Sequence, residues 1–204
     1  ERDFDNTAAN TWETVVALAR DFDAVRLIFA NSRNAGGTTA SPVMLARVAV
    51  VGSSADATLD AADWTSPATV SGSGTWNLSA ASAVQRRAFA LTDWIAVNSV
   101  PRTDGGSLPL LAVRAWVNGG NPITMLGNSA GSDSFTNWAT HPSGRIWKMR
   151  RRSGDFATVN QATFSASAVT ANESPLIGVQ YLARGRVVTV MTVGDSLSEG
   201  RGTY

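Results

Sequence analysis

Apolar and polar residues alternate over short stretches along most of the chain, and turn residues separate these stretches. In residues 24–31, Val25, Leu27 and Phe29 are spaced two apart, which is the period of a half-buried strand. We expect strands over residues 12–20, 24–31, 43–51, 87–91, 94–100, 110–118, 123–126, 145–150 and 177–183. Residues 52–83 are expected to be irregular apart from one short strand near 75–78, and a single helical turn fits residues 160–165.

This spacing of short strands predicts a mostly β fold. No stretch before residue 197 has a convincing helical period, and Gly, Pro, Asn and Asp recur between the apolar runs. Eight or more short strands joined by such turns are typical of an antiparallel β-sandwich, and a jelly-roll-like arrangement is expected.

The strand expected over residues 187–193 has a different pattern. It is β-branched at six of seven positions and lacks strict polar alternation, as in strands buried on both faces of a parallel sheet. It leads directly into Gly194, Asp195, Ser196 and Leu197, where an open α/β sheet would carry its chemistry. A serine in such a turn is presented beside backbone N–H groups that can stabilise an oxyanion, which suggests nucleophilic acyl transfer.

Residues 192–200 resemble the first signature block of the SGNH/GDSL hydrolase superfamily of serine esterases. The likeness consists of the β-branched strand, the Gly194-Asp195-Ser196-Leu197 turn and Gly200. The resemblance implies that Ser196 is the nucleophile and that its backbone N–H is one oxyanion donor. It also implies that Gly194 and Asp195 shape the turn, and it implies no cofactor.

The other parts of that family's site are not found in this sequence. The family's remaining oxyanion donors are a Gly and an Asn on later loops, and its base is a His in an Asp-x-x-His block. The single histidine, His141, has Trp138 where that Asp would stand. We therefore expect residues 1–183 to form an N-terminal β-sandwich ancillary domain and residues 187–204 to begin an α/β/α SGNH domain. The remainder of that domain would come from a longer parent chain or from a second chain.

Composition and charge narrow the classes of partner. Of the 204 residues, 44% are hydrophobic and 16% are charged, and the net charge of +1 gives no electrostatic reason to expect nucleic acid. The chain has no cysteine, which excludes disulfides and thiolate metal sites, and no cluster has metal-ligand spacing. No apolar run approaches the roughly 20 residues of a membrane span. The first residue is not Met, and we favour a secreted, periplasmic or virion-associated location over a cytoplasmic one.

Aromatic and basic residues supply further candidates for binding. Most of the seven tryptophans are expected in the core, whereas Trp64, Trp76 and Trp138 lie in polar, loop-like stretches and could stack on sugars. The run of arginines at 150–152 could contact a phosphate or an anionic glycan. The simpler interpretation is the solvated end of an edge strand, where charge discourages pairing.

Two classes of function remain. The first is a serine esterase or deacylase that hydrolyses an ester, possibly on an acylated carbohydrate, through an acyl-enzyme at Ser196. The second is a non-catalytic binding or structural module, such as a carbohydrate-binding or virion surface component. An Asp-x-x-His block about 150–200 residues downstream would favour the enzyme. In either case we expect the 204-residue chain alone to be inactive.

Overall fold

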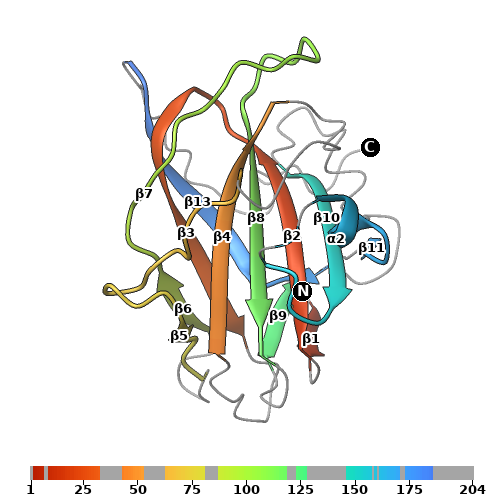
Figure 1. Cartoon of the computed structure of the whole chain (residues 1–204). Coiled ribbons are helices and arrows are strands. Elements are labelled where there is room, and N and C mark those ends of the chain that lie inside the picture. The colour runs from red at the N-terminus through yellow and green to blue at the C-terminus, as the bar shows by residue number, and fades with distance from the viewer. Residues whose placement is uncertain are drawn as a thin grey trace, which may run out of the picture.

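The computed structural model of the chain describes residues 2–6, 9–32, 43–52, 63–80, 87–118, 123–127, 146–157, 159, 161–170 and 173–185. Within these residues the fold is mostly β, and the strands pair antiparallel in three sheets. The predicted mostly β, antiparallel sandwich is therefore confirmed (Figure 1). The described helix is a single short one, α2 (Gln161–Ser165), where the sequence suggests a helical turn. No helix in the described part of the chain is long and apolar enough to cross a membrane.

The largest sheet has six strands. Its order is β11 (Val169–Thr170), β10 (Ile146–Ser153), β2 (Asn10–Ala17), β8 (Leu110–Val117), β4 (Val43–Val51) and β5 (Trp76–Asn77). Figure 1 shows β4, β8, β2 and β10 side by side, with β3 and β13 behind them.

The second sheet has four strands and crosses behind the first. Its order is β13 (Leu176–Ala183), β3 (Phe22–Ser32) and β6 (Arg87–Leu91), and β7 (Ile95–Ala96) also pairs with β3. A third sheet contains β1 (Arg2–Asn6), β9 (Ile123–Gly127) and β12 (Glu173–Ser174).

The main core lies between the six-stranded and four-stranded sheets. Because side chains alternate across a strand, one face of each sheet supplies this core. It is formed by Val25, Leu27 and Phe29 of β3, Met44, Ala46 and Val48 of β4, and Leu111, Val113, Ala115 and Val117 of β8. Burying these aliphatic and aromatic side chains is the main source of stability, at about 25 cal/mol per Å² of apolar surface.

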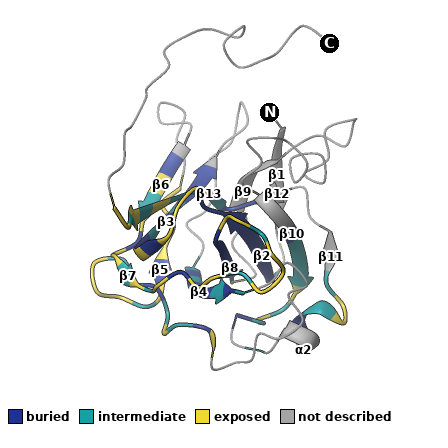
Figure 2. Ribbon diagram, turned by 90° about the horizontal axis from the view of Figure 1, so that it is seen from above, coloured by how far each residue is buried: buried dark blue, intermediate teal, exposed yellow. Residues whose placement is uncertain are grey.

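The six-stranded sheet is also covered on its outer face. Every residue of β2 is buried, and Trp116 is the single residue of β8 that is partly exposed. Trp64 lies over part of this outer face, where it packs with Val15, Ala49 and Leu110. Figure 2 shows β2 and β8 in the dark blue of buried residues, whereas exposed segments lie along β6 and β7.

Several expected strands agree closely with the structure. The bounds of β4 and β6 equal the predicted ranges 43–51 and 87–91, and β5 lies where a short strand is expected. The range 94–100 is wrong, because only Ile95–Ala96 pairs as a strand there. After this short strand, Ser99 bonds to the start of β3. Its N–H donates to Phe22 O and its Oγ donates to Asp21 Oδ1.

Three described strands are not anticipated by the sequence pattern. β1 is rich in Asp and Asn, which have low strand propensity, and it is held by pairing with β9. β11 and β12 are two residues each, too short for any periodicity to show. The segment expected over 187–193 lies outside the described residues, so the division between 1–183 and 187–204 stays a prediction.

Candidate functional site

The predicted nucleophile turn is not among the described residues. Gly194, Asp195, Ser196, Leu197 and Gly200 all lie beyond residue 185, the last that the structure describes. His141 and Trp138 also lie outside the described ranges. The assignment of Ser196 therefore rests on the sequence.

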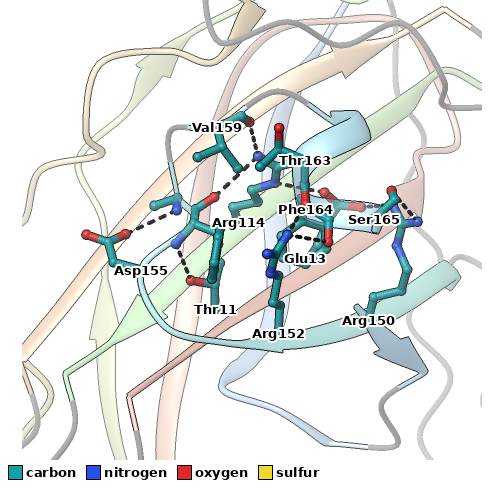
Figure 3. Close-up of polar contacts among 12 residues, drawn as sticks. Thr11, Glu13, Arg114, Arg150, Arg152, Asp155, Val159, Thr163, Phe164 and Ser165 are labelled. Carbon is teal, nitrogen blue, oxygen red and sulfur yellow. Dashed lines mark hydrogen bonds and ion pairs between the residues drawn. The ribbon is translucent and has the colours of Figure 1, made fainter. Parts of the chain in front are cut away.

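Within the described residues, the main cluster of charged side chains lies on the outer face of the six-stranded sheet. The strand register places Arg150, Glu13, Arg114 and Arg47 in one row across β10, β2, β8 and β4. Directly opposed residues on neighbouring strands bring their side chains within contact distance. A single carboxylate is thus placed between two arginines (Figure 3).

Glu13 forms ion pairs on both sides. Arg114 Nε donates to Glu13 Oε2 at 2.8 Å, and Arg150 Nη2 donates to Glu13 Oε1. The Glu13 and Arg114 side chains are 1% and 0% exposed. A pair this deeply buried persists only because each charge has a partner and further hydrogen bonds.

Arg114 also holds the chain that covers it. Its Nη1 donates to the carbonyl oxygens of Phe156, at 3.3 Å, and Val159. Its guanidinium lies 4.2 Å from the centroid of the Trp64 ring and 4.6 Å from that of Phe164. Aromatic rings attract such a cation through their negative faces. One arginine therefore links Trp64 and the covering residues Phe156, Val159 and Phe164 to the sheet.

Neighbouring residues on the same face fix the covering segment further. Thr11 Oγ1 donates to Gly154 O at 2.8 Å and accepts from Phe156 N at 2.9 Å. Arg150 Nη1 donates to Ser165 Oγ at 2.9 Å, and Arg152 Nη1 donates to the carbonyl oxygens of Thr163 and Phe164 (Figure 3). The arginines of β10 thus tie α2 to the sheet through two of its carbonyl oxygens and the Ser165 hydroxyl.

Electrostatics at this cluster follow from its burial. Desolvation lowers the pKa of Arg114 below its ordinary value, while Glu13 opposes that shift by stabilising the charged guanidinium. The positive charge of Arg150 lowers the pKa of Arg114 as well. Because both members of the Glu13–Arg114 pair are inaccessible to a substrate, the cluster is suited to holding the fold rather than to catalysis.

The structure corrects the interpretation of residues 150–152 as the solvated end of an edge strand. β10 is paired on both sides, with β2 and with β11, so it is not an edge. Arg150 is mostly buried against Glu13 and Phe164. Two features of the sequence could have indicated this arrangement. Glu13 and Arg114 each interrupt an otherwise uncharged strand, and a single charge in each of two buried strands points to an ion pair.

The tryptophan candidates for sugar stacking are also corrected. Trp64 and Trp76 are buried, with 5% and 7% of their surface exposed. Trp76 packs against Phe29 in the main core, with ring centroids 5.9 Å apart. Trp94, which the sequence places in a strand, is instead exposed at the surface. Polar sequence surroundings were misleading because Trp64 lies in a segment that packs on the outer face, and Trp76 lies in β5, which pairs with β4 and contributes to the main core.

A groove of about 290 Å³ lies between β2 and β13. Its lining is mainly apolar and includes Val16, Leu18, Leu176 and Val179, with Thr14 and Tyr181 as polar members. Thr14 Oγ1 and Ser174 Oγ lie 3.4 Å apart at this place. The lining contains no carboxylate, imidazole or amine. Among the described residues no group of three His, Cys, Asp or Glu side chains is placed to hold a metal ion.

Comparison of the sequence with models of known protein families finds no match, and comparison with curated proteins finds none either.

Proposed function

We propose that this chain is the N-terminal part of an SGNH-type serine ester hydrolase, in which the β-sandwich is an ancillary domain. The observation that carries the proposal is the block at residues 192–200, where a β-branched strand ends in Gly194-Asp195-Ser196-Leu197 and Gly200 follows. A serine at the carboxyl end of a buried strand is placed for acyl transfer.

In the proposed reaction Ser196 Oγ attacks the carbonyl carbon of an ester while a base takes its proton. The resulting oxyanion accepts a hydrogen bond from the backbone N–H of Ser196 and from donors on later loops. Collapse expels the alcohol, which receives the proton, and leaves an acyl-enzyme on Ser196. Water, deprotonated by the same base, then releases the acid and restores the serine.

The rest of the site is proposed to come from chain beyond Tyr204 or from a second chain. The only histidine of the sequence is His141, which lacks the Asp-x-x-His setting of the family. The described part of the sandwich contains no histidine that could activate a serine, and its buried carboxylate, Glu13, is paired with two arginines. An ancillary role for the sandwich agrees with both observations.

The test uses the protein that contains the downstream segment and compares two serines of the same turn. Ser196→Ala should abolish nearly all hydrolysis of p-nitrophenyl acetate, because no other residue can supply the nucleophile. Ser198→Ala, two residues along, should keep most of the activity and serves as the matched control. Both variants should unfold at the midpoint of the parent protein. Ester hydrolysis that persists in Ser196→Ala at the level of the Ser198→Ala control would exclude the proposed nucleophile.

A further inference from the structure

The two sheets of the sandwich differ in how their outer faces are treated. The outer face of the six-stranded sheet is covered by Trp64 and by residues 154–157 and 161–165. The outer face of the four-stranded sheet instead carries large hydrophobic side chains in contact with solvent. Exposed apolar groups gathered on one face mark an interaction site more often than chance.

The exposure of this second face is large. The exposed fractions are 56% for Phe89, 51% for Leu182, 44% for Trp94 and 40% for Leu91. The register places Phe89 opposite Ala30 and Leu91 opposite Ile28, and it places Leu182 opposite Ala24. Along β3, Ala24, Ile28 and Ala30 alternate with the core residues Val25, Leu27 and Phe29. They and their partners on β6 and β13 therefore lie on the side that points away from the core.

Polar groups lie among these hydrophobic ones rather than around them. Arg26 lies opposite Gln180 on the same face, and Arg26 Nε donates to Gln180 Oε1 at 2.5 Å. The Arg26 guanidinium lies over the Trp94 ring, 4.8 Å from its centroid. Two contacts therefore hold the guanidinium in place, and the aromatic ring beside it is held as well.

Asp93 fixes the backbone that presents Trp94. Its Oδ2 accepts from Thr69 Oγ1 at 2.6 Å and from Gly72 N at 2.9 Å, and its own N–H donates to Thr69 O at 2.7 Å. Ser71 and Gly72 adopt positive φ in the turn that makes these contacts. Trp94 is thus an exposed aromatic residue on an anchored segment, which lowers the entropy that a ligand would lose on binding.

Arg26 supplies a positive charge on this face. Among the described residues no carboxylate pairs with Arg26, whose contacts are Gln180 and Trp94. By contrast Arg184, at the end of β13, pairs with Asp23. A guanidinium held by its Nε leaves its two terminal nitrogens to meet a carboxylate in a bidentate manner.

We propose that this outer face binds an acidic polysaccharide, with one sugar ring stacked on the Trp94 indole face opposite Arg26 and the carboxylate of a neighbouring sugar paired with Arg26. A uronic-acid chain combines apolar ring faces, hydroxyls and carboxylates. The ring faces would contact Trp94 and Leu182, the hydroxyls would bond to Gln180, and the carboxylates would pair with Arg26. This binding is distinct from hydrolysis at Ser196 and does not depend on it.

The arrangement favours a glycan over a protein partner. The fully buried centre of a protein interface is poor in charged groups other than arginine, and polar residues form its rim. Here Arg26 and Gln180 lie in the interior of the face, between Leu182 on one side and Leu91 on the other. Interleaved polar and apolar groups suit a ligand whose own polar and apolar groups alternate.

The test titrates the 204-residue chain with galacturonate, glucuronate-containing and mannuronate oligosaccharides, using calorimetry and the indole N–H signal of Trp94. The methyl ester of the galacturonate oligomer keeps the sugar ring but lacks the charge, so it serves as the matched ligand. The test variants are Trp94→Ala and Arg26→Gln. The control is Arg20→Gln, which removes a different exposed arginine.

We expect an acidic oligosaccharide to bind and to shift the Trp94 signal. Arg26→Gln and Trp94→Ala should each weaken binding about tenfold or more, since a charge-assisted hydrogen bond is among the stronger polar contacts. Arg20→Gln should leave affinity unchanged. The methyl ester should bind the parent chain no better than the acid binds Arg26→Gln.

Three results would overturn the proposal. The first is no binding of any of these acidic oligosaccharides at millimolar concentration. The second is equal loss in Arg26→Gln and Arg20→Gln, which would indicate general charge attraction. The third is concentration-dependent dimerisation of the chain that Trp94→Ala abolishes, which would assign the face to protein contact. Unfolding midpoints of all variants confirm that each is folded.

Discussion

Neutralising Glu13 is expected to destabilise the sandwich far more than neutralising a surface carboxylate. Glu13→Gln keeps the shape of the side chain but removes the negative charge that pairs with both Arg114 and Arg150. Both guanidinium groups would remain where the fold places them. Arg114 would then be a fully buried cation that has lost its ion pair with Glu13.

The magnitude follows from burial. Removing one partner of a buried ion pair costs about 3–5 kcal/mol, because the remaining charge stays desolvated. A domain of this size is typically stable by about 5–15 kcal/mol, so the loss is a large part of the total. At about 2–4 °C per kcal/mol, the expected fall in Tm is roughly 6–20 °C.

The assay is urea unfolding followed by tryptophan fluorescence, with thermal unfolding as a second measurement. The matched control is Asp23→Asn, which neutralises the carboxylate of the Arg184–Asp23 pair, whose side chains are 47% and 54% exposed. An exposed pair contributes about 0–1 kcal/mol, so this control should change stability little. In the Glu13→Gln background, Arg150→Met should recover part of the loss because it removes one of the two cations that Glu13 neutralises.

The reasoning fails if Glu13→Gln and Asp23→Asn destabilise the protein equally, within about 1 kcal/mol. It also fails if Arg150→Met is as costly in the Glu13→Gln background as in the parent chain. Either result would mean that the buried row is hydrated or rearranges freely. The description of Arg114 as a fixed link between the sheet and its covering segments would then be wrong.

Three further predictions concern the domain boundary, the activity of this chain and one loop. A chain ending at Ala183 should be soluble and unfold cooperatively; precipitation of that chain, with the 204-residue chain monodisperse, would place residues 187–193 in the sandwich. The purified 204-residue chain should hydrolyse p-nitrophenyl acetate no faster than its Ser196→Ala variant, since each missing oxyanion donor costs about 10²–10³ in rate; robust Ser196-dependent turnover would contradict this. The hydrogen bond from Thr69, with one from Gly72, lowers the pKa of Asp93 below its ordinary 3.8, so its contribution to stability is present above that pH and is lost as the pH falls through the lowered pKa. Thr69→Val should raise this pKa in a carboxyl NMR titration, and an unchanged value would contradict the assignment.

Much of the fold could be predicted from periodicity alone. The strands β4 and β6 are bounded by turns and carry clear apolar alternation, so their ranges match the structure. The failures have physical causes. β1 is a polar segment that becomes a strand only through pairing with β9. The strand Ile95–Ala96 is shorter than expected because Val97 and Ser99 each make only isolated backbone hydrogen bonds to the start of β3.

The binding surfaces could be predicted less well. Trp64 and Trp76 lie in polar stretches yet are buried, while Trp94 lies in an apparently apolar strand yet is exposed. Burial of such side chains depends on whether a loop folds back onto a sheet, which local sequence does not specify. The Glu13–Arg114 pair joins positions 101 residues apart, so the lone charges in two apolar strands indicate an ion pair, but the register of β2 against β8 is needed to place them opposite each other.

Covalent labelling of Ser196 tests the central claim most directly. The protein that contains the downstream segment would be treated with a fluorophosphonate, digested and mapped by mass spectrometry. We expect one phosphonylated serine, Ser196, because only a serine activated by a neighbouring base reacts. Ester hydrolysis should be lost in proportion to the labelling of Ser196. Labelling of a different residue, with Ser196 unmodified and esterase activity present, would contradict it.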